Sequence, residues 1–255
     1  MTLVGAAIIF FAAMVAGALN SVAGGGSFIS FPVLVFTGVP PIASNATSTV
    51  ALWPGSVAAA VAYRNRLPRG SRIFVPLALA SLAGGVLGAV LLLHTPQATF
   101  MHLVSYLFGV ATLLFAFGRK LTERLRHVFK REAPPTLPMI AGASAVQLAI
   151  SIYGGFFGGG IGILMLALLE MIHMDDIHAM NGVKSLLAAG INGAAVVTFV
   201  FAGAVFWPQA VVMIAGATLG GYGGARVAQK LSPRWVRGLV IGMGTFMTVY
   251  FLWRY

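Results

Sequence analysis

One charged side chain, Lys184, stands inside an otherwise uncharged apolar segment that runs from about 180 to 202. A lysine without a partner at the centre of a lipid bilayer costs on the order of 3 kcal/mol, so we expect its ammonium group to have a partner. No acid lies in the same segment to neutralise it, which favours an anion as that partner. The alternative is that the side chain snorkels to the membrane surface, because Lys184 is close to the start of the segment.

Polar side chains gather at the start of two apolar segments that occupy matching places in the two halves of the chain. The candidate ligands for an anion are Asn45, Thr47 and Ser48 in the first half, and Asn181, Lys184, Ser185 and Asn192 in the second half. The alternative for Asn45 and Asn181 is helix capping, for which Asn, Ser and Thr side chains are favoured. The sequence leaves both interpretations open.

Two glycine clusters lie near the middle of apolar blocks that are too long for one membrane crossing. As a straight helix, block 3–36 would extend roughly 50 Å, whereas the hydrocarbon core of a bilayer is about 30 Å thick. The clusters are Gly24, Gly25 and Gly26 in the first block, and Gly154 and Gly155 followed by Gly158, Gly159 and Gly160 in block 138–169. Glycine is a poor helix former, so we expect both blocks to break at these clusters. The N-termini of broken helices carry partial positive charge, which favours an anion cradle between the breaks over simple close packing.

A second pair of glycine stripes lies on segments of ordinary length. These stripes are Gly84, Gly85 and Gly88 in the first half, and Gly220, Gly221 and Gly224 in the second half. Small residues at this spacing let membrane helices approach closely, so we expect a packing role for them.

Acidic and histidine side chains between 170 and 178 resemble metal ligands by type, but their spacing is not that of a known metal site. A solvated loop is the favoured interpretation, and we expect neither a metal nor a cofactor. No phosphate loop, nucleophile elbow or zinc-protease motif is present in the sequence. With no positioned acid, base or nucleophile in the apolar segments, an enzyme is disfavoured.

The composition is that of a protein embedded in a lipid bilayer. Of 255 residues, 59% are hydrophobic and 8% are charged, whereas a soluble domain is nearer a quarter charged. Each apolar block is long enough to cross or enter a membrane, and the blocks fall at about 3–36, 43–63, 73–93, 98–118, 138–169, 180–202, 208–228 and 238–253. The sequence therefore predicts an all-α polytopic membrane protein.

The net charge of +11 does not indicate a nucleic-acid partner. Fourteen of the sixteen Lys and Arg residues lie in three short stretches between apolar blocks, namely 64–72, 119–131 and 226–237. Loops that remain in the cytoplasm carry such an excess of positive charge. The absence of cysteine excludes disulfides and thiolate metal sites.

The two halves repeat the same order of features. We assign residues 1–118 to a first repeat, 119–137 to a basic cytoplasmic linker and 138–255 to a second repeat. A fixed order of glycine clusters, polar segment starts and glycine stripes within each half indicates a duplication.

Loop charge predicts that the two repeats face opposite sides of the membrane. The loop at 64–72 is basic while its counterpart at 202–206 is uncharged, and the loop at 226–237 is basic while its counterpart at 94–97 has no Lys or Arg. Each copy is then a glycine-broken helical hairpin followed by three transmembrane helices. This inverted repeat places both termini on the external side of the cell inner membrane.

The chain resembles the sulfite exporter TauE/SafE family of membrane permeases. The resemblance covers nearly the whole chain and rests on the ordered segments 23–28 (AGGGSF), 43–48 (ASNATS), 158–162 (GGGIG) and 181–185 (NGVKS). It implies an all-helical permease that moves small sulfur anions, such as sulfite or organosulfonates, across the cytoplasmic membrane. Where many members have a Thr-Ser pair, this chain has Lys184-Ser185, so the identity of the anion stays open and carboxylates fit the charge as well.

The sequence thus predicts a transporter for a small anion that works by alternating access, with its site between the two broken hairpins. A passive anion channel and a carboxylate carrier are the alternatives. A homodimer is compatible with the sequence, and a cofactor is not expected.

Overall fold

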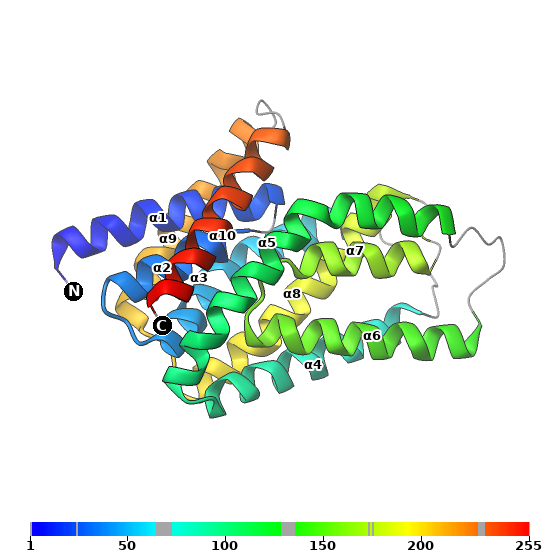
Figure 1. Cartoon of the computed structure of the whole chain (residues 1–255), viewed down its shortest axis with the longest axis horizontal. Helices are drawn as coiled ribbons and strands as arrows, with labels where there is room; N and C mark the ends of the chain where they lie inside the picture. The colour runs from blue at the N-terminus through cyan, green and yellow to red at the C-terminus, as the bar shows by residue number, and fades with distance from the viewer. Residues whose placement is uncertain are drawn as a thin grey trace.

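The computed structural model describes residues 2–23, 25–64, 73–128, 136–172, 174, 176–228 and 233–254. Every regular element in these ranges is an α-helix, which confirms the predicted all-α fold (Figure 1). The helices of the first half are α1 (Leu3–Ala23), α2 (Ser27–Phe36), α3 (Pro41–Ala62), α4 (Phe74–His94) and α5 (Gln97–Val128). The helices of the second half are α6 (Leu137–Phe156), α7 (Ile161–Met171), α8 (Ile177–Phe201), α9 (Trp207–Ala228) and α10 (Pro233–Arg254).

The two halves place helices of similar length in the same order. α1 and α6 have 21 and 20 residues, and the short helices α2 and α7 that follow them have 10 and 11 residues. Each long and short pair replaces one over-long apolar block, so the predicted helix break is confirmed in both halves. α5 has 32 residues and continues to Val128, so the basic stretch expected as a linker begins inside a helix.

The two breaks have different backbone conformations. At the first break, Gly25 and Gly26 connect α1 to α2, and Gly26 has helical dihedral angles (φ −58°, ψ −36°); Gly24 lies outside the described residues. At the second break, Gly158 and Gly160 have φ angles of 85° and 79°. These left-handed conformations are accessible to glycine without a steric penalty, which explains why the chain turns there.

Gly154 and Gly155 do not break the helix, contrary to the prediction, because both lie in the last turn of α6. A Cβ atom on Gly155 would collide with the backbone of Gly85 in α4, and one on Gly154 would press on the side chain of Ile191 in α8. Close approach of neighbouring helices therefore explains these two glycines, and no turn is needed.

Glycines also allow the two most extensive helix contacts, α4 with α6 and α1 with α9. A Cβ atom on Gly88 would collide with the carbonyl of Ile152, and one on Gly220 would collide with the carbonyl of Met14. The packing role predicted for the two glycine stripes is confirmed at these positions.

Contacts between helices occur in pairs that exchange the two halves. The contact of α1 with α9 is matched by the contact of α6 with α4. In the same way, the contact of α3 with α9 is matched by that of α8 with α4, and the contact of α2 with α10 is matched by that of α7 with α5. The equivalent helices α3 and α8 contact each other, and so do α5 and α10. In Figure 1 the α1–α2 hairpin lies toward the end of the molecule that carries the N-terminus, whereas the α6–α7 hairpin extends toward the opposite end.

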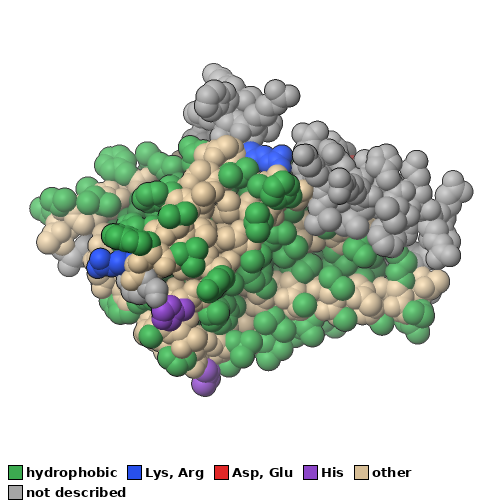
Figure 2. Space-filling model, in the orientation of Figure 1, with side chains coloured by type: hydrophobic (Ala, Val, Ile, Leu, Met, Phe, Trp, Pro, Cys, Tyr) green, Lys and Arg blue, Asp and Glu red, His purple; other side chains and the backbone are tan. Residues whose placement is uncertain are grey.

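The surface of the described helices is largely apolar. Large side chains such as Leu79, Val211, Leu239 and Phe246 are exposed, and Figure 2 shows hydrophobic side chains over much of the face in view. By length and composition, five of the described helices are suited to crossing a membrane, with spans at Leu3–Asn20, Phe74–His94, Gln97–Gly118, Leu137–Phe156 and Ala179–Phe201. The chain is therefore a membrane protein whose outer surface contacts lipid.

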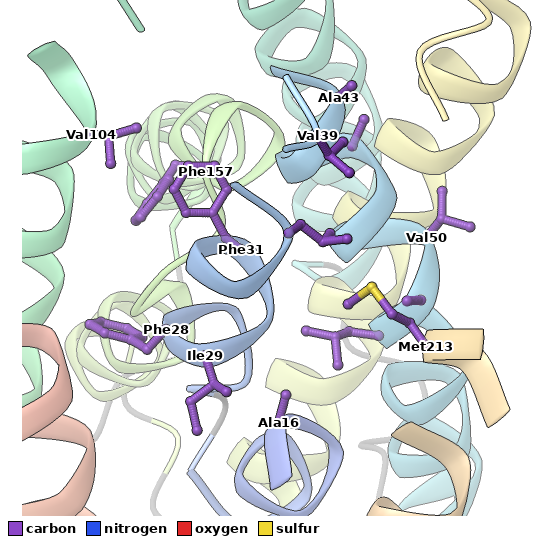
Figure 3. Packing of buried hydrophobic residues seen from close by; sticks show 14 of the residues in the cluster. Ala16, Phe28, Ile29, Phe31, Val39, Ala43, Val50, Val104, Phe157 and Met213 are labelled. Carbon is purple, nitrogen blue, oxygen red and sulfur yellow. The ribbon is translucent and has the colours of Figure 1, made fainter. Parts of the chain in front are cut away.

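Aromatic rings form the centre of the buried core. The ring of Phe108 in α5 lies 5.2 Å from that of Phe28 in α2, 5.2 Å from that of Phe157 at the second break and 5.9 Å from that of Phe251 in α10, measured between ring centroids. Figure 3 shows Phe28, Phe31 and Phe157 in the same buried cluster. This cluster joins the first broken hairpin to the second break.

Candidate functional site

Lys184 lies in the second turn of α8 and is half-buried. Its ammonium nitrogen Nζ donates a hydrogen bond to Oδ1 of Asn181 at 2.9 Å. Helical side chains point back toward the N-terminus of their helix, which is why a lysine meets the residue three positions earlier. The acceptor is a neutral amide, so this bond holds the ammonium group in place without neutralising it.

The side chain of Lys184 also lies against the start of α7. Its Cδ atom is 3.5 Å from the position that a Cβ atom on Gly162 would occupy. A Cβ atom at 162 would thus make an ordinary van der Waals contact with the lysine, which places the lysine stem beside the first turn of α7. The first amides of a helix have no acceptor within the helix and carry partial positive charge. Lys184 and the start of α7 thus form one electropositive region.

The backbone of the second break is held by a hydrogen bond from Tyr153. The hydroxyl group of Tyr153 in α6 donates to the carbonyl of Gly159 at 2.7 Å. The amide of Ile163 donates to the carbonyl of Gly160 at 3.1 Å, which closes the first turn of α7. Predicted site residues Gly158, Gly159 and Gly160 therefore lie in one fixed turn next to the region of Lys184.

Asn181, Lys184, Ser185 and Asn192 lie on one face of α8, because their spacings of three, four and seven residues match the helical period. All of them are half-buried. Asn192 follows Ile191, which packs against glycines of α4 and α6. The second-half residues predicted for the site are thus brought to one face of one helix, next to the second break.

The first-half residues have a different environment, because each bonds to the protein itself. The amide nitrogen Nδ2 of Asn45 donates to the carbonyl of Phe156, the last residue of α6, at 3.1 Å. Oγ1 of Thr47 accepts a bond from the amide of Phe206 at 3.0 Å. Two of these side chains therefore connect α3 to the second half of the chain.

Ser48 bonds within its own half, and all three first-half side chains are buried. Its Oγ is 2.6 Å from Oγ of Ser30 in α2, and Ser30 also donates to the carbonyl of Gly26 at 3.1 Å. Gly25 packs against Val240 and Phe115. The first break is therefore tightly packed in this conformation.

The helix-capping alternative is wrong for both asparagines. α3 begins at Pro41 and α8 at Ile177, so Asn45 and Asn181 are each the fifth residue of their helix. An N-cap side chain must precede the first helical residue. Asn45 does satisfy a helix end, but the end belongs to α6.

One turn of α5 contacts both breaks. The Cβ atom of Ala111 is 3.3 Å from the position that a Cβ atom on Gly159 would occupy. Cζ of Phe115 is 3.6 Å from the corresponding position on Gly25. With Phe108 touching rings from both sides, aromatic side chains lie between the two breaks in this conformation. The place of the expected cradle between the paired breaks is thus filled by these side chains in this conformation.

Two side chains with direct contacts to backbone were not singled out from the sequence. The indole nitrogen of Trp53 in α3 donates to the carbonyl of Ala189 in α8 at 3.0 Å. The guanidinium of Arg237 in α10 donates to the carbonyls of Phe115 and Ala116 in α5 at 2.8 and 2.6 Å. The available signals were a lone tryptophan in apolar block 43–63 and a basic residue immediately before apolar block 238–253.

Comparison with known proteins agrees with this architecture. The sequence matches the family described as sulfite exporter TauE/SafE over residues 9–251. It is 30% identical over 236 residues to a probable membrane transporter protein, ORF9, from Sinorhizobium sp, which covers 92% of this chain and 87% of that protein. It is 27% identical to a probable membrane transporter protein of Haemophilus influenzae, over 95% of this chain and 92% of that protein.

The probable membrane transporter protein YfcA of Escherichia coli K12 is also 27% identical, over 96% of this chain and 89% of that protein. No solved structure matches the chain. The family match includes both helix breaks and the whole of α8. The chain therefore belongs to the sulfite exporter TauE/SafE family and is a membrane transporter.

Proposed function

We propose that this transporter carries a small anion, sulfite or an organosulfonate, and that the anion binds at Lys184 beside the second break. The observation that carries the proposal is the position of the Lys184 ammonium group, half-buried in a membrane helix and bonded to a neutral amide. A charge held in this way at membrane depth is costly unless it serves a ligand. An anion that binds there supplies a counter-charge to the ammonium group.

The start of α7 adds to the attraction for an anion. Gly160 sets the left-handed turn that precedes α7, and the stem of Lys184 lies beside Gly162 in the first turn of that helix. Positive helix ends at a break in a membrane helix commonly bind anionic groups of substrates. Asn181, Ser185 and Asn192 supply hydrogen-bonding groups on the same face of α8 and orient the oxygen atoms of the ligand.

The first half supplies the matching side of the site during transport. We propose that alternating access rocks one copy against the other and exposes Asn45, Thr47, Ser48 and the break at Gly24, Gly25 and Gly26 to the same ligand. The bonds that these side chains now make to the protein belong to one conformation of the transport cycle, in which the first half of the site is closed. When the copies rock, some of those bonds are exchanged for bonds to the anion. Support comes from the cross-copy bonds of Asn45 and Thr47, which must change when the copies move.

The two copies are proposed to be inverted in the inner membrane, with both termini outside. Paired helix contacts that exchange the halves support a duplicated architecture, and the hairpins extend toward opposite ends of the molecule. The positions of basic loops support the same orientation.

Proteoliposomes with labelled anions test the proposal. A panel of sulfite, organosulfonates and short carboxylates is supplied to vesicles that contain the purified protein. We expect saturable uptake of a sulfur oxyanion and counterflow when unlabelled anion is preloaded, since a carrier exchanges its ligand whereas a channel does not. Uptake without saturation or counterflow would favour a passive channel, and uptake of carboxylates alone would favour a carboxylate carrier.

A further inference from the structure

Helices α5 and α10, which occupy matching places in the two halves, cross each other through a pair of threonines (Figure 1). Thr112 and Thr248 are each the sixteenth residue of their helix. A Cβ atom on Gly244 in α10 would collide with Oγ1 of Thr112. In the same way, Cγ2 of Thr248 is 3.5 Å from the position that a Cβ atom on Gly109 in α5 would occupy. Each threonine therefore packs on a glycine of the other helix, at the centre of the crossing.

Arg237 connects the two helices at one end of this crossing. Its Nε donates to the carbonyl of Phe115 at 2.8 Å, and its Nη2 donates to the carbonyl of Ala116 at 2.6 Å. Arg237 precedes Gly244 in α10, whereas Phe115 and Ala116 follow Thr112 in α5, so the two helices run antiparallel. Hydrogen bonds from a charged donor are stronger than those between neutral groups. These two bonds, here called the Arg237 bridge, therefore hold this end of α10 on α5.

The equivalent place at the other end of the crossing holds an apolar side chain. Arg237 is the fifth residue of α10, and the fifth residue of α5 is Met101. The thioether of methionine has no hydrogen-bond donor, and Met101 is only 4% exposed. A crossing whose centre is alike in the two halves thus has a charged bridge at one end and apolar packing at the other.

The Arg237 bridge lies at the end of the crossing that covers the first helix break. Val240 comes one turn after Arg237, and its two Cγ atoms are each 3.2 Å from the position that a Cβ atom on Gly25 would occupy. Cζ of Phe115, whose carbonyl accepts a bond from the bridge, is 3.6 Å from the same position. Gly25 is thus packed under two side chains that the bridge holds together. Separation of α10 from α5 at this end would uncover the first break.

Alternating access requires the two halves to separate at one side of the membrane at a time. Because α5 belongs to the first half and α10 to the second, separation at the first break must disrupt both bonds of the bridge. Separation at the other end disrupts apolar contacts instead. We infer that Arg237 is a positioning residue for transport, which keeps the transporter closed at the first break until the two halves rock apart. The effect of the bridge on opening does not depend on which anion is carried, whereas its use in transport rests on the proposed function.

Two buried valines at matching places can report opening at the two ends of the crossing. Val240 is the eighth residue of α10 and Val104 is the eighth residue of α5, and both are 0% exposed. Since the chain has no cysteine, Val240→Cys and Val104→Cys can each be treated with a water-soluble thiol reagent in purified transporter. We expect Arg237→Met, which copies Met101, to raise the reaction rate of Val240→Cys about tenfold or more, the scale for losing hydrogen bonds to a charged group. The rate of Val104→Cys should not rise.

Arg254→Met is the matched control, because Arg254 is an exposed arginine in the last turn of the same helix. This control removes the same charge from α10 and should leave the rates of both cysteines unchanged. Arg237→Lys should give Val240→Cys an intermediate rate, since an ammonium group can still donate to one of the two carbonyls. This second variant keeps the test decisive if Arg237→Met lowers the yield of folded protein.

The results that would overturn the inference are distinct from those that would reject the proposed function. An unchanged rate for Val240→Cys when Arg237→Met is added would overturn the inference. A rise in the rates of both cysteines together would also overturn it, because Arg237 would then stabilise the fold as a whole without controlling one end. Faster reaction of Val240→Cys alone, in a protein that takes up no anion, would support the bridge and reject the proposed anion transport.

Discussion

The starts of α3 and α8 occupy matching places in the order of helices of the two halves, but their polar side chains have different environments. Asn45, Thr47 and Ser48 at the start of α3 are buried and bonded to protein groups. Lys184 at the start of α8 is half-buried and bonded to a neutral amide of its own helix. The polar groups at the start of α3 thus connect parts of the protein, whereas the ammonium group at the start of α8 is bonded within its own helix.

This difference teaches that helices in matching places of the two halves need not have matching environments. A hydroxyl or amide group can be satisfied by a single well-placed bond, whereas an ammonium group needs a counter-charge or water. Under the proposed function, the lysine at the start of α8 therefore assigns the recognition of charge to the second half.

The largest effect is expected from labelling that tests whether the two copies face opposite sides. The chain has no cysteine, so single cysteines report position without background. Arg69→Cys, Arg124→Cys and Arg234→Cys should react only with reagent on the cytoplasmic side, and Ala204→Cys only with reagent outside, because positive loops stay inside. Reaction of Arg234→Cys from outside would overturn the inverted repeat.

Removal of the charge at the start of α8 should have the next largest effect. Lys184→Ala is expected to weaken anion binding by about 2–4 kcal/mol, the range for losing one partner of a desolvated charge pair, which is roughly 30- to 1,000-fold in affinity. Lys184→Arg should restore part of the affinity and alter preference among anions, because the planar guanidinium replaces a compact donor. Equilibrium binding of labelled anion measures both.

A lysine that only snorkels would give another result. Its replacement by alanine would leave affinity unchanged in protein that reaches normal levels in the membrane. That outcome would remove Lys184 from the site and place the recognition of charge elsewhere.

Substitutions at the start of α3 should mainly lower the stability of the protein. Asn45→Ala leaves the buried carbonyl of Phe156 without its donor, so the free energy of unfolding should fall by about 1–3 kcal/mol. Asn181→Ala at the equivalent place in α8 should lower stability less, because that side chain is half-buried. Thermal unfolding in detergent compares the pair, and equal losses would contradict the division of roles.

The smallest effect is expected from the hydroxyl pair of the first half. Ser30 and Ser48 share one hydrogen bond of 2.6 Å, and polar pairs between membrane helices contribute about 0.6 kcal/mol on average. A double-mutant cycle of Ser30→Ala and Ser48→Ala should return a coupling energy near that size. A coupling energy of several kcal/mol would contradict this expectation and show that the stability of the first break depends mainly on the Ser30–Ser48 hydrogen bond.

Much of the fold could be predicted from the sequence, because lipid imposes local rules. Backbone groups in hydrocarbon must bond within a helix, so apolar blocks became helices at the expected places. The excess length of two blocks predicted the breaks. Of the residues predicted for the site, Lys184, Asn181 and Gly160 lie in one region, while the first-half residues are bonded to protein; their role in binding stays a prediction.

What the sequence by itself determined is the membrane location, the order of helices and the two breaks, since each follows from the run lengths of apolar and glycine residues. Only the tertiary structure decided that Gly154 and Gly155 serve close packing, that Phe108 lies between the breaks and that Gln147 meets Ser81. These outcomes depend on the register between helices far apart in sequence. Close-packed side chains fix that register only when all the helices are in place.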